Sequence, residues 1–174
     1  MNYFEFFELQ PAFSIDEDAL KIKFYANSKK YHPDFYTLES VEKQAEVMQL
    51  AVSNNKAYKI LSNFESRLKY ILELEEHLGE EGSNKLPQSF LMEMMDFNEK
   101  VMELQFDFDQ TTFETCKKEL EELKVNFLAE VQPDLDNYQF KNTSSESLEN
   151  IKLFYLKNRY LLRIQESLLK FANA

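Results

Sequence analysis

The sequence predicts an all-α fold, because it is poor in the residues that make tight turns and because its apolar residues recur at helical spacing. The 174 residues include 2 glycines and 4 prolines, beside 16 phenylalanines and 9 tyrosines. Hairpins and phosphate-cradling loops depend on glycine and proline, so this composition disfavours both. Apolar positions three and four residues apart are typical of amphipathic helices. A chain of this length can bury a sizeable core without disulfides.

Charge and composition exclude several classes of partner. The formal net charge is −11, whereas nonspecific nucleic-acid binding needs a basic face that contacts phosphates. No stretch approaches the roughly 20 apolar residues of a membrane span. The single cysteine permits no intramolecular disulfide, and the first residues lack the pattern of a secretory signal. We therefore expect a soluble, cytoplasmic protein that binds neither nucleic acid nor membrane.

The first long helix is predicted to begin at Ser14 and to end before Pro33. Ser14 and Glu17 have the spacing of a capping box. The apolar stripe of this helix runs to Tyr31. Proline has no N–H and disfavours the α conformation of the residue before it, so the helix has to stop there. The aromatic segment at 3–9 is expected to pack on the core as one or two helical turns.

Two more helices complete the predicted N-terminal half. One runs from about 40 to 61, antiparallel to the first because the connection between them is short. The next is expected to start at Asn63, as its N-cap, and to stop at Gly79. Asn27 and Asn54 interrupt the apolar stripes of the first two helices. Since an unpaired buried amide costs about 1–3 kcal/mol, both are expected to reach a backbone group, water or the edge of the core.

Both glycines fall in the segment 79–87, which is therefore the predicted linker between two domains. The first domain comprises 1–78 and the second 88–174. Pro133 is expected to end or kink a helix of the second domain. That domain is predicted to be an antiparallel three-helix bundle, because short connections join its long helical patterns. The three patterns cover 88–108, 112–131 and 145–172.

The turn at His32-Pro33-Asp34 follows the most basic stretch of this acidic chain. Residues 19–31 hold four lysines and no acidic residue. These lysines are Lys21, Lys23, Lys29 and Lys30. A solvated helix face is one interpretation of such a cluster, but beside an exposed turn it favours a contact surface.

The predicted helix at 88–108 is apolar on two sides. One set has the spacing of a complete core stripe: Phe90, Met94, Phe97, Val101, Leu104 and Phe108. A second set lies off that stripe and is interleaved with acids: Leu91, Met92, Met95 and Met102, with Asp96, Glu99 and Glu103. Exposed apolar patches with a polar rim mark binding surfaces, and methionine adapts to irregular partners. The alternative is that these methionines fill the core beneath a neighbouring helix.

Five short segments together resemble a known family. Tyr31-His32-Pro33-Asp34 between two antiparallel helices, followed by 55–61, resembles a J domain. Asn2-Tyr3-Phe4, the segment 67–72 and Phe90-Leu91-Met92-Glu93 narrow the resemblance to the HscB family, the J-protein co-chaperones of iron–sulfur cluster assembly. The tripeptide alone is a weak signal. Several motifs in order, over nearly the whole length, are a specific one.

The resemblance implies two partners. J domains use the His-Pro-Asp loop and the basic face of the preceding helix to dock on a DnaK-class ATPase and stimulate its hydrolysis. HscB-like proteins do so for HscA, while their C-terminal bundle presents the scaffold protein IscU. The implied chaperone-binding residues are His32, Pro33, Asp34, Lys23, Lys29 and Lys30. The implied scaffold-binding residues are Leu91, Met92, Met95, Asp96, Glu99, Glu103 and Tyr155.

Three features depart from the family pattern. Asn27 and Asn54 occupy positions where J domains normally place large aliphatic residues. Phe35 stands where a lysine usually follows the tripeptide. The cysteine-pair metal module of some eukaryotic members is absent, which favours the bacterial form without zinc. No cofactor is expected.

Two other classes of function stay open at this point. One is a J-domain helical adaptor that delivers a different client to a DnaK-type chaperone. The other is an enzyme in which His32 acts as general base, oriented by Asp34. It is disfavoured because no activated serine or cysteine is placed beside them and a loop tip does not exclude water. Cys116 is interpreted as a buried small hydrophobe rather than a cluster ligand.

Overall fold

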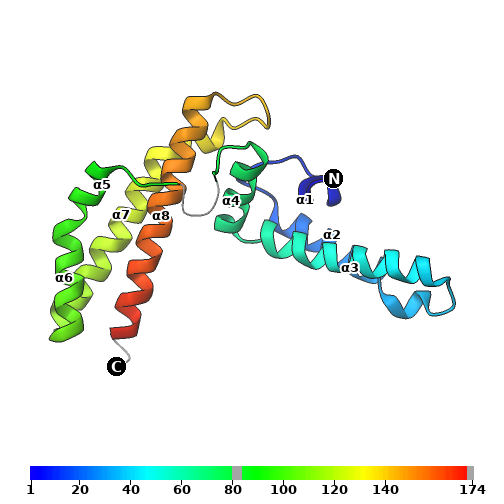
Figure 1. Cartoon of the computed structure of the whole chain (residues 1–174), viewed down its shortest axis with the longest axis horizontal. Helices are drawn as coiled ribbons and strands as arrows, with labels where there is room; N and C mark the ends of the chain where they lie inside the picture. The colour runs from blue at the N-terminus through cyan, green and yellow to red at the C-terminus, as the bar shows by residue number, and fades with distance from the viewer. Residues whose placement is uncertain (80–83, 172–174) are drawn as a thin grey trace. The chain divides into compact units, whose positions relative to one another are not determined.

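The computed structural model describes residues 1–79 and 84–171, and over these ranges the chain forms helices and loops without a strand (Figure 1). The predicted all-α fold is confirmed. The chain divides into two compact units. Unit 1 comprises Met1–Glu75 and Tyr138–Thr143, and unit 2 comprises Glu76–Asn137 and Ser144–Ala174. Residues 80–83 of the predicted linker lie outside the described residues.

Unit 1 is built on an antiparallel pair of long helices, which lie side by side (Figure 1). Its elements are α1 (Tyr3–Phe6), α2 (Glu17–Lys30), the 3₁₀ turn η1 (Pro33–Tyr36), α3 (Val41–Leu61) and α4 (Phe64–Leu74). Its most deeply buried side chains come from every helix: Phe4, Phe7, Leu20, Val47, Leu61, Leu68, Ile71 and Leu72. The helical hairpin that the sequence predicts is therefore present.

Two predicted helix ends in unit 1 are wrong. Asp16 caps α2 in place of Ser14, because its carboxylate accepts the N–H of Ala19 at 2.9 Å and the helix starts directly after it. The helix α4 ends at Leu74, well before Gly79. Glu76 follows with φ 59°, so a non-glycine residue takes the left-handed conformation that ends many helices. The predicted cap of α4 is confirmed, since the Asn63 side chain accepts the N–H of Ser66.

Segments that carry the family resemblance contact each other in unit 1. The N–H of Tyr3 donates to the hydroxyl of Tyr70 at 2.9 Å, and the two rings stack with centroids 4.6 Å apart. The buried guanidinium of Arg67 donates through Nε to the carbonyl of Phe13 at 3.0 Å and through Nη1 to the carbonyl of Leu61. Burial lowers the pKa of Arg67 from its ordinary value. This side chain therefore ties the loop before α2 to the end of α3.

Replacing Arg67 by methionine is expected to destabilise the protein by about 2–4 kcal/mol, because hydrogen bonds from a charged donor to two carbonyls are lost while the apolar stem is kept. Urea unfolding followed by circular dichroism measures the change. Arg163→Met, at an exposed position of unit 2, is the control. A loss below about 0.5 kcal/mol, the range of ordinary surface substitutions, would contradict this role for Arg67.

The loop Tyr138–Thr143, distant in sequence, is part of unit 1. The hydroxyl of Tyr138 donates to Glu75 at 2.7 Å, and the N–H of Lys141 donates to the same carboxylate at 2.9 Å. The Glu75 side chain is 4% exposed. The Tyr138 ring also packs against Phe13, with centroids 4.6 Å apart. The sequence-based domain limits place this loop with 88–174, whereas its contacts group it with the N-terminal residues.

The pKa of Tyr138 is raised well above 10.0 by burial and by its hydrogen bond to Glu75. The folded chain therefore keeps a proton that the unfolded chain releases once the pH passes about 10. The contribution of this group to stability is complete below that pH, and we expect it to be lost as the pH rises further. Urea unfolding free energies measured between about pH 8 and pH 11 test this, with Tyr138→Phe expected to show a shallower decline. Equal slopes for the two proteins would contradict it.

The buried amide of Asn54 is satisfied on one side. Its side chain is 1% exposed, and Nδ2 donates to the carbonyl of Phe24 at 3.1 Å and to the hydroxyl of Ser28 at 3.0 Å. The expectation that this amide reaches a backbone group is confirmed for its nitrogen. Its oxygen is buried without a hydrogen-bond partner in the described chain.

In the described residues of unit 2 there are four helices in place of the three that the sequence predicts. They are α5 (Gln88–Glu93), α6 (Met95–Phe106), α7 (Gln110–Asp136) and α8 (Ser145–Phe171). The predicted helix at 88–108 is interrupted at Met94. Pro133 does not end α7, which continues to Asp136. Val131 and Leu135 are buried on either side of it, and this packing offsets the hydrogen bond that proline removes.

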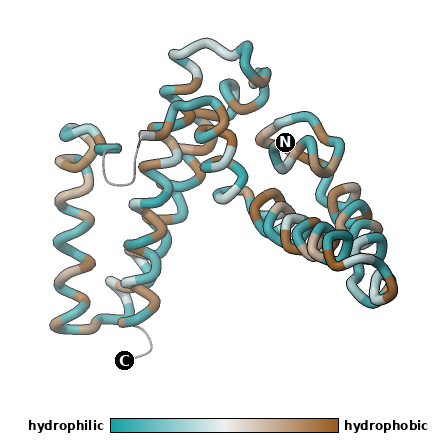
Figure 2. Tube along the Cα trace, turned by 45° about the vertical axis from the view of Figure 1, so that its right-hand side comes forward, coloured by the Kyte–Doolittle hydropathy of each residue, from teal (hydrophilic) through white to brown (hydrophobic). Residues whose placement is uncertain are grey.

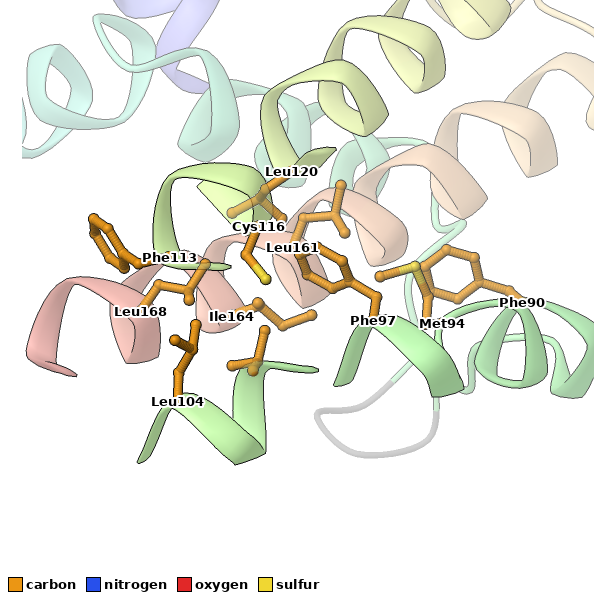
Figure 3. Close-up of a cluster of buried hydrophobic side chains, with 11 residues drawn as sticks. Phe90, Met94, Phe97, Leu104, Phe113, Cys116, Leu120, Leu161, Ile164 and Leu168 are labelled. Atoms are coloured by element: carbon orange, nitrogen blue, oxygen red, sulfur yellow. The ribbon is translucent and has the colours of Figure 1, made fainter. Parts of the chain in front are cut away.

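The core of unit 2 is an apolar cluster to which all four helices contribute (Figure 3). Five of the six residues of the predicted core stripe belong to it: Phe90, Met94, Phe97, Val101 and Leu104. Phe108 does not, because α6 ends at Phe106 and the helical phase is lost. Cys116 is buried in this cluster, as predicted. Figure 2 shows hydrophobic and hydrophilic residues alternating along the long helices, as amphipathic packing requires.

Candidate functional site

The His-Pro-Asp tripeptide forms a single hydrogen-bonded turn at the tip of the α2–α3 hairpin. His32 has extended backbone and caps η1, and its Nδ1 accepts the N–H of Asp34 at 3.3 Å. Pro33 is the first residue of the turn, and the N–H of Phe35 donates to the carbonyl of His32 at 3.1 Å. The hydroxyl of Tyr36 donates to the carbonyl of Lys30 at 2.8 Å. The tip is thus fastened to the end of α2.

The side chains of the tip face solvent. Those of His32 and Asp34 are 53% and 83% exposed, with Nδ1 and Oδ2 3.7 Å apart. Phe35 is exposed as well, and its ring lies 5.8 Å from that of His32. No wall of side chains surrounds the imidazole, so the arrangement offers a contact surface and not a reaction pocket.

The predicted lysines of α2 differ in their surroundings. Lys29 and Lys30 are exposed within three residues of His32. Lys23 is half-buried and forms an ion pair with Glu8 at 3.4 Å, which neutralises part of its charge. Two exposed apolar residues of α2, Ile22 and Tyr25, were missed by the sequence reasoning. The signal was available, because Ile22, Tyr25 and Lys29 have the i, i+3, i+7 spacing of one helix face.

A second exposed surface lies on α5 and α6. Met92 and Met95 are each 63% exposed, and Leu91 and Met102 are exposed too. The idea that these methionines fill the core is therefore wrong. Phe106, 83% exposed, extends the same stripe eleven residues after Met95, and sequence reasoning missed it. We call Leu91, Met92, Met95, Met102 and Phe106 the methionine ridge.

Acidic residues flank the methionine ridge. Asp96, Glu99 and Glu103 are all exposed, as predicted from their spacing. Tyr155 of α8 does not join this surface: it is 5% exposed, and its hydroxyl accepts a long hydrogen bond of 3.4 Å from Arg159. Six of the seven implied scaffold-binding residues are thus exposed on α5 and α6, and the seventh is buried.

Within residues 1–79 and 84–171, no three histidine, cysteine or acidic side chains converge in a way that could hold a metal ion. None of the helices placed by the structure has the length and apolar character needed to cross a membrane.

An α-helical hairpin with an exposed His-Pro-Asp tip, followed by a separate helical bundle, is the organisation of a J-domain co-chaperone. Residues 86–169 match the family model described as the HSCB C-terminal oligomerisation domain. The chain is 33% identical over 131 residues to the co-chaperone protein HscB homolog of Vibrio parahaemolyticus, covering 69% of this chain and 76% of that protein. The homolog from Vibrio vulnificus strain YJ016 is 29% identical over 171 residues, 97% and 99% of the two chains.

Two solved structures share the fold. The chaperone HscB from Vibrio cholerae has a TM-score of 0.66 at 24% identity, with 97% of this chain and 99% of that chain covered. The human co-chaperone protein HscB has a TM-score of 0.77 at 22% identity, covering 97% and 80%. The chain belongs to the HscB co-chaperone family. Membership implies a J-protein role in iron–sulfur cluster assembly, and the relatives are named co-chaperones, which describes a non-enzymatic role.

Proposed function

We propose that this chain is a cytoplasmic J-protein co-chaperone with two binding surfaces and no catalytic activity of its own. The His-Pro-Asp tip of the J domain, residues 1–78, stimulates the ATPase of an HscA- or DnaK-type chaperone. The bundle at 88–174 binds an IscU-type iron–sulfur scaffold protein. Together these contacts would deliver the scaffold to the chaperone and assist cluster maturation.

The hydrogen-bonded geometry and the exposure of the tip support the first contact. Pro33 has a fixed φ, and the hydrogen bonds of His32 and Tyr36 restrict the conformations open to the turn. A surface that is ordered before binding loses little conformational entropy when it docks. Lys29 and Lys30 add positive charge beside it, which accelerates encounter with an acidic partner surface.

The exposed methionine ridge is the observation that carries the second contact. The core of unit 2 is complete without Met92 and Met95, so their exposure has no explanation in the fold. Monomeric proteins seldom leave several large apolar side chains adjacent in water without a partner. The same positions are those that the family resemblance assigns to scaffold binding.

Asp34→Asn tests the first contact. The side chain is 83% exposed, so the substitution is expected to leave helicity unchanged while the stimulated ATP turnover of an HscA-type chaperone falls to its unstimulated rate. Steady-state phosphate release measures turnover, and circular dichroism checks the fold. Glu39→Gln, at an exposed position five residues further on, is the control. Full stimulation by Asp34→Asn would show that the tip is not the docking signal.

Met92→Ala combined with Met95→Ala tests the second contact. Truncating two apolar side chains at the centre of an interface is expected to weaken binding of an IscU-type scaffold by about tenfold or more. Isothermal titration calorimetry measures the affinity. Val125→Ala, an exposed apolar position on α7, is the matched control. If the double variant binds the scaffold as wild type does, the chain is better described as a J-domain adaptor for a different client.

A further inference from the structure

A cavity of about 380 Å³ lies between α6 and α7 in unit 2, against the outside of the apolar core cluster. Its floor is apolar and is formed by Met94, Phe97, Leu123 and Phe127. Its rim is acidic and is formed by Glu93, Asp96, Glu119 and Glu122.

The protein already places one ammonium group at this rim. Lys100 lines the cavity, and its Nζ lies 3.1 Å from both carboxylate oxygens of Glu119. Lys118 reaches Glu122 at 3.8 Å, but that lysine side chain is 80% exposed, so solvent screens the pair. The charges of Glu93 and Asp96 are left to attract a further cation.

The combination of an apolar floor and an acidic rim selects the kind of group that fits. Anions are repelled, and the carboxylates of the described residues do not converge closely enough for a metal ion. A purely apolar ligand would cover the floor, but it would also displace the water that hydrates the carboxylates. It offers no hydrogen bond in exchange, so its binding is disfavoured. The side chain of lysine or arginine meets both demands, because its stem is apolar and its end is cationic.

The cavity shares Asp96 with the implied scaffold-binding residues. Asp96 belongs to its rim and follows Met95 of the methionine ridge directly in α6. A protein lying on the ridge would therefore reach the cavity. A second copy of this chain is disfavoured as the occupant, since two chains that each carry a net charge of −11 repel one another.

We propose that this cavity receives a lysine or arginine side chain of the protein that covers the methionine ridge; this rests on the proposed function, in which that protein is an IscU-type scaffold. The assignment adds Glu119 and Glu122 of α7 to a surface otherwise built from α5 and α6. It also gives Lys100 a role as an internal competitor for the incoming cation.

Two substitutions with opposite expected effects test the proposal, with scaffold affinity measured by calorimetry at low and high salt. Glu122→Gln removes a rim charge and is expected to weaken binding about threefold, with a smaller loss of affinity on adding salt. Lys100→Gln frees Glu119 for the incoming cation and is expected to tighten binding about twofold. Glu114→Gln and Lys117→Gln change the net charge equally at exposed positions of α7 outside the cavity.

The affinities of the cavity variants and of their controls support or overturn the proposal as follows. Opposite shifts for the two cavity variants, with unchanged affinity for their controls, support the proposal. If the controls shift as much as the cavity variants, net charge explains the effect and the proposal is overturned. If Met92→Ala with Met95→Ala weakens binding while Glu122→Gln and Lys100→Gln do not, the proposed function stands and this inference fails. Absence of scaffold binding by the wild-type chain overturns both. A loss of self-association in Glu122→Gln, seen by sedimentation, would assign the cavity to a second copy.

Discussion

The fixed backbone of Pro33 is the constraint on which the N-terminal unit depends. Proline cannot continue α2, so the chain turns within a few residues and α3 packs back antiparallel to α2. The same residue begins η1, where a missing N–H has no cost. The carbonyl of Lys30 has no helical partner because it lies at the C-terminal end of α2. The hydroxyl of Tyr36 donates a hydrogen bond to it. One residue therefore shapes both the hairpin and its exposed tip.

The local sequence pattern was enough to predict the helices whose apolar residues recur at regular spacing. The hairpin, the turn at Pro33 and the long helices α7 and α8 follow from spacing and from the chemistry of proline, since each is determined by residues close in sequence. The interruption at Met94 was not predictable in this way. Phe90 and Met94 are both buried, so the apolar period runs through the break almost unchanged. The early end of α4 was missed because Glu76, and not a glycine, takes the left-handed conformation.

In the candidate surfaces too, features set by residues close in sequence could be predicted, whereas contacts between distant residues could not. The methionine ridge could be predicted because the core stripe of the same helix was already complete without it. The ion pair of Lys23 with Glu8 joins two different elements, and no spacing rule indicates it. Tyr155 was assigned to the scaffold surface by resemblance alone, and in this chain it is buried in the stripe of α8 that includes Ile151. Resemblance to a family can imply a role for a residue, but it does not show whether that side chain is buried or exposed in this chain.

The loop that joins α7 to α8 has a consequence for synthesis of the protein. Because Tyr138 and Lys141 supply the partners of Glu75, the N-terminal unit is discontinuous along the polypeptide. A ribosome releases the hairpin early, yet the last contacts of that unit form only after most of the bundle has emerged from the exit tunnel. Completion of the N-terminal unit is thus linked in time to synthesis of the bundle, and recombination between genes at the glycine-containing linker would separate Glu75 from the residues that satisfy it.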